Sequence, residues 1–195
     1  GRLPKTNRSL RVALHTATHS ALLYSASDIS VWRTEELVEH PFLARIGPDI
    51  LAPDLSWQLI AARLGEARFA RRQLADLYLD QAFLAGVGNY LRAEILFAAG
   101  LDPARRAGDL GRGERGRLAR ATLAVSRRSY ETAGIVLPPR LAGRLEREGL
   151  PRERRRFFVF GRDGHPCYRC GGEVQRSERG GRRLYRCPAC QPAAA

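Results

Sequence analysis

Four cysteines near the end of the chain constrain its fold more than any other feature. They form Cys-Tyr-Arg-Cys at 167–170 and Cys-Pro-Ala-Cys at 187–190, two pairs separated by sixteen residues. Each pair has the spacing of a zinc knuckle, and the interval fits a β-hairpin that brings the pairs together. Soft sulfur ligands in tetrahedral geometry suit Zn²⁺. We therefore expect one structural Zn²⁺, with these ligands: Cys167, Cys170, Cys187 and Cys190.

Two disulfides or four free thiols are the alternative interpretations of the same cysteines. Disulfides would need an oxidising compartment, and the sequence shows no signal peptide. A module of about 35 residues has almost no hydrophobic core, so a bound metal would supply most of its folding free energy. Zinc alone does not define a function, because many zinc ribbons are purely structural.

The charge of the chain is strongly positive and is carried by arginine. Of 33 basic residues, 32 are arginine and one is Lys5, and the formal net charge is +13. Residues 151–195 hold eleven bases and four acids, which is more than half of the excess. Such a concentration is typical of proteins that bind polyanions, nucleic acid first. Arginine-biased amino-acid usage on an ordinary surface is the alternative.

The sequence predicts no membrane partner. No stretch approaches the roughly 20 apolar residues that a membrane-spanning helix needs. A role at the membrane surface is disfavoured, because no basic amphipathic helix with an aromatic face accompanies the charge.

The first part of the chain has the alternation of β-strands. In residues 9–32 the segments RVALHTA and ALLYSASDISVW alternate, and the polar THS between them predicts a hairpin. Two strands cannot bury a face by themselves, so we expect them to be the edge of a larger sheet. The chain contains no methionine and begins with Gly1. We therefore expect a processed chain or a piece of a longer one.

The middle of the chain has helical periodicity after a Pro- and Gly-rich connector at 40–53. The pattern predicts helices at 57–64 after an N-cap at Ser56, at 70–79, at 90–100 with a C-cap at Gly100, and at roughly 114–132. Residues 135–156 read as a basic, proline-punctuated linker with room for one helical turn. The expected domains are a sheet remnant at 1–40, a helical domain at 41–150 and a cysteine module at 151–195.

Arginines gather at the tip of the hairpin expected between the two cysteine pairs. Gly180 and Gly181 form the tip, which places Arg179, Arg182 and Arg183 at or near it. Guanidinium groups held on a metal-stapled hairpin could bind phosphate bidentately. A solvated turn is the alternative.

Residues 81–89, QAFLAGVGN, form the second informative segment. Two glycines before a helix let the backbone turn sharply and approach a ligand, while the helix N-terminus offers N–H donors to an anion. Asn89 is placed either to cap the helix or to join that anion site. A simple packing joint between two helices would have the same pattern.

These segments together resemble one known family. LDQAFLAGVGNYLRAEIL, residues 79–96, resembles the helix-two-turn-helix motif of the DNA glycosylases related to formamidopyrimidine-DNA glycosylase and endonuclease VIII. The cysteine hairpin with its arginine resembles the zinc finger of the same family, in the same order. YSASDI at 24–29 and HPFLARIGPDIL at 40–51 resemble the endonuclease VIII branch. The implied fold is α+β and multidomain: a remnant of an N-terminal β-sandwich, a helix-two-turn-helix domain and a C-terminal zinc-ribbon β-hairpin.

The resemblance also implies an activity. The family removes oxidised bases, pyrimidines in this branch, and nicks the strand at the abasic site by β,δ-elimination. An N-terminal proline amine attacks the sugar C1′ and forms a Schiff base, with an adjacent glutamate as acid. Neither residue has a match in this chain, and Lys5 stands in the wrong context for the family lysine. This chain by itself is therefore expected to be inactive, as the DNA-binding portion of such an enzyme.

The DNA contacts of the family carry over to four residues. Asn89, preceded by Gly88, matches an asparagine that binds a backbone phosphate beside the lesion. Arg45 matches an arginine that contacts DNA between the domains. Arg182 matches the zinc-finger arginine that grips the phosphates and assists the second elimination.

The partner implied by the resemblance is double-stranded DNA with an oxidised base or an abasic site. The protein is expected to be a monomer in the bacterial cytoplasm, associated with the nucleoid. Residues 135–156 depart from the endonuclease VIII pattern, so the lesion preference stays open. A non-catalytic, zinc-dependent module that binds damaged DNA is the alternative function. A zinc-ribbon protein of the transcription or translation machinery is a third, which would not need the glycine turn before Asn89.

Overall fold

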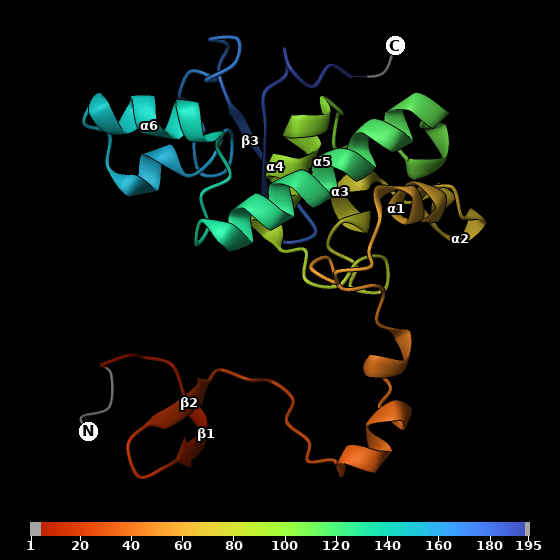
Figure 1. Ribbon diagram of the computed structural model, residues 1–195, viewed down its shortest axis with the longest axis vertical. Helices are drawn as coiled ribbons and strands as arrows, with labels where there is room; N and C mark the ends of the chain where they lie inside the picture. The colour runs from red at the N-terminus through yellow and green to blue at the C-terminus, as the bar shows by residue number, and fades with distance from the viewer. Residues whose placement is uncertain (1–4, 194–195) are drawn as a thin grey trace. The chain divides into compact units, whose positions relative to one another are not determined.

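A computed structural model describes residues 5–193, which form two compact units divided between Ala44 and Arg45 (Figure 1). In the first unit β1 (Leu10–His15) and β2 (Ser20–Tyr24) pair as an antiparallel hairpin, which confirms the predicted one. Two 3-10 helices follow, η1 (Thr34–Glu39) and, at the end of the unit, η2 (Leu43–Arg45). None of residues 5–44 is buried, as expected for a sheet edge without a partner layer.

The second unit contains six α-helices among the described residues and one β-hairpin. The helices are α1 (Trp57–Leu64), α2 (Ala67–Ala70), α3 (Leu74–Leu77), α4 (Asn89–Ala99), α5 (Arg112–Glu131) and α6 (Pro139–Arg147). The hairpin is β3 (Gln175–Arg179) with β4 (Arg182–Arg186), and the 3-10 helices are η3 (Ala107–Asp109) and η4 (Arg152–Arg155). Both predicted caps are confirmed. Ser56 Oγ accepts from the Leu59 N–H at 3.2 Å, and Gly100 ends α4 with a φ of +66°.

Two helix predictions were wrong. The helix expected at 70–79 is reduced to α3 at Leu74–Leu77, after α2 has ended at Ala70, because Gln73 is extended and pairs with Arg106 in an isolated β-bridge. The next two N–H groups donate to carbonyls of residues 105 and 103, so tertiary hydrogen bonds replace the helical ones. The linker expected at 135–156 contains α6, where Pro139 is the first helical residue. Proline is favoured at the first position of a helix. Leu145 is the buried residue of α6.

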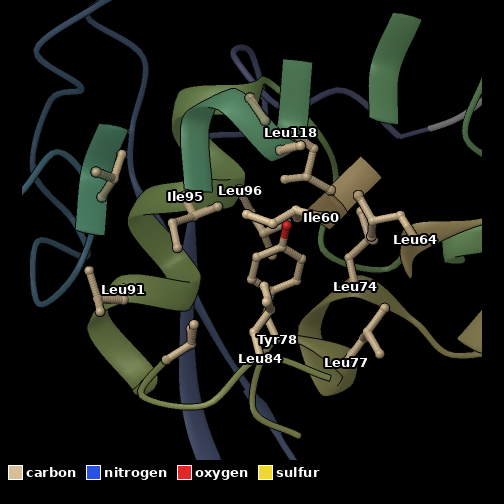
Figure 2. Close-up of a cluster of buried hydrophobic side chains, with 14 of the residues drawn as sticks. Ile60, Leu64, Leu74, Leu77, Tyr78, Leu84, Leu91, Ile95, Leu96 and Leu118 are labelled. Carbon is tan, nitrogen blue, oxygen red and sulfur yellow. The ribbon is translucent and has the colours of Figure 1, made fainter. Parts of the chain in front are cut away.

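The main core lies between α1, α3, α4 and α5 (Figure 2). Figure 2 shows Tyr78 at the centre of this core. Its phenol oxygen is 2.8 Å from the hydroxyl oxygen of Thr122. Burial of this apolar surface is the dominant favourable term in folding. The labelled core residues are Ile60, Leu64, Leu74, Leu77, Leu84, Leu91, Ile95, Leu96 and Leu118.

A second apolar cluster lies under the cysteine module and shares α4 with the main core. Ala93 and Phe97 of α4 belong to it, and Leu91 and Ile95 of the same helix belong to the main core. Its other buried members are Val159, Cys167, Val174, Tyr185 and Cys187. The regions expected as separate domains, 41–150 and 151–195, therefore pack together within one compact unit from residue 45 onward. The α+β fold class is confirmed, and the three-domain division stays a prediction.

Candidate nucleic-acid interface and metal centre

The side chain of Gln81 fixes the conformation of the loop before α4 through hydrogen bonds to its backbone. Its Oε1 accepts from the Gly86 N–H at 2.9 Å, and its Nε2 donates to the Leu79 and Val87 carbonyls, both at 3.2 Å. Gly86 has a φ of +89°, where glycine is favoured, and this confirms the sharp turn. A Cβ on Gly88 would meet nothing within 4 Å. The backbone before the helix is therefore open to a ligand.

Asn89 is the first residue of α4 and does not cap it. Gly88 is the N-cap, and no side chain caps the helix, so N–H groups of the first turn stay available to an anion. The Asn89 side chain instead reaches the hairpin: Nδ2 donates to the Arg183 carbonyl at 3.0 Å. Its Oδ1 accepts from Arg92 Nη2 at 2.5 Å. Of the two placements expected for Asn89, capping was wrong, and a role in an anion site stays a prediction.

Arg92 orients Asn89 from a fully buried position. Its guanidinium also donates to the carbonyls of Ala75 and Arg183, both at 3.1 Å, and its Nε has no partner among the described residues. Burial lowers the pKa of Arg92 to about 10, while the nearby Asp76 carboxylate opposes that shift. The group remains charged at neutral pH. A buried cation therefore lies directly behind the first turn of α4.

Glu94, two residues after Arg92 in α4, holds the segment of chain that leads into the cysteine module. Its carboxylate accepts from three consecutive backbone N–H groups, Phe158, Val159 and Phe160, at 2.8 to 2.9 Å. Burial raises the pKa of Glu94, and the three hydrogen bonds oppose that shift. Glu94 thereby sets the position of the whole module relative to Asn89.

The hairpin places Arg179 and Arg182 in different environments. β3 and β4 are antiparallel with Gly180 and Gly181 at the tip, as predicted, and Arg179 pairs directly with Arg182 across the strands. Arg179 forms an ion pair with Asp76 of α3 at 2.7 Å. The guanidinium of Arg182 is exposed and makes no hydrogen bond or ion pair with any of residues 5–193. Arg182 therefore lies ready for a ligand, whereas Arg179 is already paired.

The four cysteines converge on one point. Their Sγ atoms lie within 4.8 Å of one another, with 3.5 Å between Cys170 and Cys187 and 3.9 Å between Cys167 and Cys190. A tetrahedral ion with Zn–S bonds of about 2.3 Å holds its sulfurs about 3.8 Å apart. All four thiols are free, so the disulfide alternative is not what the structure contains. The cluster can hold one metal ion.

The surroundings of the sulfurs fit a thiolate site. A hydrogen bond from the Gly172 N–H lowers the pKa of Cys170 to about 7, whereas burial raises the pKa of Cys187 and Cys190. A bound divalent cation would offset that burial and hold all four groups deprotonated. The Arg169 N–H points at Cys167 Sγ at 3.4 Å, as in a knuckle.

Of the sequence-predicted site residues, the structure brings Asn89 and the strand of Arg182 together. Arg45 ends η2 and lies two residues before Gly47, whose N–H donates to the Gln81 carbonyl at 2.8 Å. Arg45 is thus on the approach to the loop that precedes α4. Sequence reasoning missed Arg92 and Glu94. The signal was a pair of charged residues on a helix otherwise spaced for burial.

Comparisons with known proteins relate this chain to one family. The family model of the formamidopyrimidine-DNA glycosylase H2TH domain matches residues 46–138. Endonuclease 8 of Shigella sonnei (strain Ss046) is 48% identical over 191 residues, which are 98% of this chain and 69% of that protein. The chain belongs to the formamidopyrimidine-DNA glycosylase/endonuclease 8 family. The resemblance drawn from the sequence is confirmed.

Solved structures of the family have the same fold. The MutM (Fpg) protein from Thermus thermophilus is 33% identical, with a TM-score of 0.75, and the match covers 100% of this chain and 72% of that one. A Lactococcus lactis FPG mutant in complex with Fapy-dG-containing DNA matches at 21% identity with a TM-score of 0.65. That match covers 89% of this chain and 58% of the Lactococcus chain, and it shows the fold alone. None of the described helices is long and apolar enough to cross a membrane.

Proposed function

We propose that this chain is the DNA-binding portion of a base-excision-repair DNA glycosylase and abasic-site lyase. The complete protein removes oxidised bases, pyrimidines above all, and nicks the strand by β,δ-elimination. The observation that carries the proposal is the bond from Asn89 to the Arg183 carbonyl, which joins the start of α4 to the strand of Arg182. The neutral residue Asn89 in α4 and the cation Arg182 in β4, each proposed to bind a phosphate, therefore lie on two elements that a hydrogen bond holds together.

The proposed grip on DNA uses both ends of this junction. Asn89 and the uncapped N–H groups of α4 bind one phosphate, with Gly88 allowing close approach of the backbone. Arg182 binds a neighbouring phosphate and assists the second elimination, and Arg45 contacts the backbone nearby. A kinked duplex with an extruded nucleotide loses base contacts, so holding its phosphates on both sides of the kink carries the binding.

We propose Zn²⁺ as the ion of the four-cysteine cluster, one per chain, bound by Cys167, Cys170, Cys187 and Cys190. Zinc supplies no chemistry to the reaction here. It fixes the turn regions at 167–172 and 187–191, and through them the hairpin that presents Arg182. The protein is proposed to act as a monomer in the cytoplasm on double-stranded DNA with an oxidised base or an abasic site.

A non-catalytic module for damaged DNA is the second candidate. It is favoured by one observation, that the proposed phosphate ligands Asn89 and Arg182 both lie in this chain, on elements joined by the bond from Asn89 to the Arg183 carbonyl. Titration of a duplex with an abasic-site analogue, against the same duplex undamaged, tests what both candidates share. Tighter, salt-dependent binding to the analogue supports the DNA-binding role, and equal or absent binding contradicts it. Borohydride trapping on an abasic duplex separates the candidates when this chain is compared with a version that carries the upstream residues.

A further inference from the structure

Asp76 and Arg179 form an ion pair that neither the proposed phosphate grip nor the zinc cluster uses. Arg179 Nη2 donates to Asp76 Oδ2 at 2.7 Å, and its Nε lies 3.1 Å from both carboxylate oxygens. The residues are 103 positions apart, one in α3 and one at the tip of the hairpin. The pair therefore joins the helical part of the unit to the cysteine module.

The carboxylate of Asp76 lies among several cations. Besides Arg179, the charges of Arg72 and Arg92 act on it, and the hydrogen bond from Arg179 contributes most to keeping the pKa of Asp76 below its ordinary value. It is therefore ionised at neutral pH. Its charge also favours the charged form of Arg92, the group that orients Asn89.

The ion pair of Arg179 with Asp76 affects Arg182, because the two arginines lie opposite each other in the hairpin. Arg179 and Arg182 are direct cross-strand partners, so their Cβ atoms lie on the same face of the hairpin. Like charges placed directly opposite each other in a hairpin repel. Asp76 neutralises one of the two. The other, Arg182, is left without a protein partner among residues 5–193.

Two further contacts hold the same hairpin. The Arg183 carbonyl accepts from Asn89 and Arg92, and Arg186 Nη1 donates to Asp102 Oδ2 at 2.6 Å. The contact at Arg179 is the one nearest the tip, because Gly180 and Gly181 follow it directly. Loss of the Asp76 contact would free the tip while leaving the base of the hairpin attached.

We propose that Asp76 is a positioning residue for DNA binding, which docks the hairpin tip onto α3 and withholds Arg179 from the phosphates so that, of the two cross-strand arginines, Arg182 presents its charge there. This inference rests on the proposed DNA-binding function. Asp76 touches no substrate in this role and acts through Arg179.

The test is the salt dependence of DNA binding by the zinc-loaded chain, measured on a duplex with an abasic-site analogue. Each phosphate contact by a cation contributes about 0.9 to the slope of log K against log salt. We expect Arg182→Ala to reduce that slope by about 0.9 and Arg179→Ala to leave it unchanged. Asp76→Ala should steepen it by up to about 0.9, because Arg179 becomes available to DNA.

Asp54→Ala is the matched control, because it removes an exposed acid that forms no ion pair within residues 5–193. It adds the same net charge as Asp76→Ala without releasing an arginine. The charge reversal Asp76→Arg with Arg179→Asp should restore the slope and the protection of the hairpin. The proposal is overturned if the salt slope of Asp76→Ala equals that of Asp54→Ala. It is also overturned if Arg179→Ala reduces the salt slope as much as Arg182→Ala does.

Hydrogen exchange in the DNA-free chain tests the docking independently of DNA. Asp76→Ala should speed exchange in residues 175–186, and the charge reversal should slow it again. Unchanged exchange in Asp76→Ala overturns the inference while the DNA-binding function stands. Absence of salt-dependent DNA binding by the unaltered chain instead overturns the proposed function, and the inference with it.

Discussion

The side-chain amide of Asn89, at the start of α4, donates a 3.0 Å hydrogen bond to the backbone carbonyl of Arg183 in β4. The two residues are 94 positions apart, and the bond ties the helical part of the unit to the hairpin. The amide nitrogen of asparagine carries two N–H donors, so one remains for a phosphate oxygen. Asn89 can therefore bind within the protein and bind DNA at the same time.

Replacing Arg182 by alanine should weaken DNA binding and reduce its salt dependence. A lost charge-assisted contact costs about 1–3 kcal/mol, and the lost counterion release lowers the salt slope by about 0.9. Titration of an abasic-analogue duplex at several salt concentrations measures both. Arg112→Ala removes an equal charge at the first residue of α5 and serves as the control. Equal effects of the two variants would show that only net charge matters.

Replacing Asn89 by alanine should lower affinity by a similar amount, about 1–3 kcal/mol, with little change in the salt slope. The residue is neutral, so no counterion is released by its contact. The loss includes the freed Arg183 carbonyl and the lost Arg92 contact, which loosen the hairpin. The same titrations measure it. Binding by Asn89→Ala that matches the unaltered chain would remove Asn89 from the interface.

Metal removal should unfold the cysteine module selectively. We expect one zinc per purified chain by elemental analysis, bound by the four cysteines. Chelation should raise hydrogen exchange across residues 157–191, because the module depends on the metal for most of its stability. The core around Tyr78 should stay protected, because its buried side chains other than Phe157 lie outside residues 157–191. Purified protein without zinc, or intact disulfides between these cysteines, would refute this prediction.

Glu94→Gln should destabilise the attachment of the cysteine module. Glutamine offers one acceptor oxygen to a site where three N–H groups now bind two, so at least one buried donor loses its partner. The expected cost is about 1–3 kcal/mol in urea unfolding. Glu131→Gln, an exposed acid at the end of α5, should change stability little. A cost no greater than that of this control would contradict the anchoring role of Glu94.

This chain alone should form no covalent adduct with abasic DNA under borohydride. A Schiff base needs a nucleophilic amine at the sugar C1′, and the chain has no match to the family's N-terminal proline. A version that carries the upstream residues should be trapped. Trapping by the 195-residue chain would require another amine, for which Lys5 would be the first candidate.

Much of the fold could be predicted from local sequence rules. The hairpin around residues 16–19, the N-cap at Ser56, the C-cap at Gly100 and the tip at Gly180 and Gly181 each depend on residues that are neighbours in the chain. The cysteine spacing likewise encodes the convergence of the four sulfurs. In each of these places short-range chemistry determines the structure, and the prediction was correct.

The cap of α4 and the helix α6 were local features that the sequence interpretation got wrong, whereas the remaining errors and omissions concern interactions between distant segments. Gln73 interrupts a helical pattern because it pairs with Arg106, and the pattern of residues 70–79 contains no trace of that partner. Arg179 lies at the hairpin tip, as expected, but its ion pair with Asp76, far away in the sequence, was not foreseen. Arg92 and Glu94 are buried charges whose partners lie 91 and 64–66 positions along the chain. Such contacts follow from tertiary packing and not from spacing.

The dual packing of α4 restricts which length changes the family can tolerate here. Asn89 binds the hairpin and Glu94 binds residues 158–160 from the same helix. Each α-helical residue turns the chain by about 100°. An insertion or deletion of one codon between these two positions would therefore rotate one contact by about 100° around the helix axis while the other stayed in place. Related genes that keep this junction are expected to vary in the loops around α4 but not in the number of residues from Asn89 to Glu94.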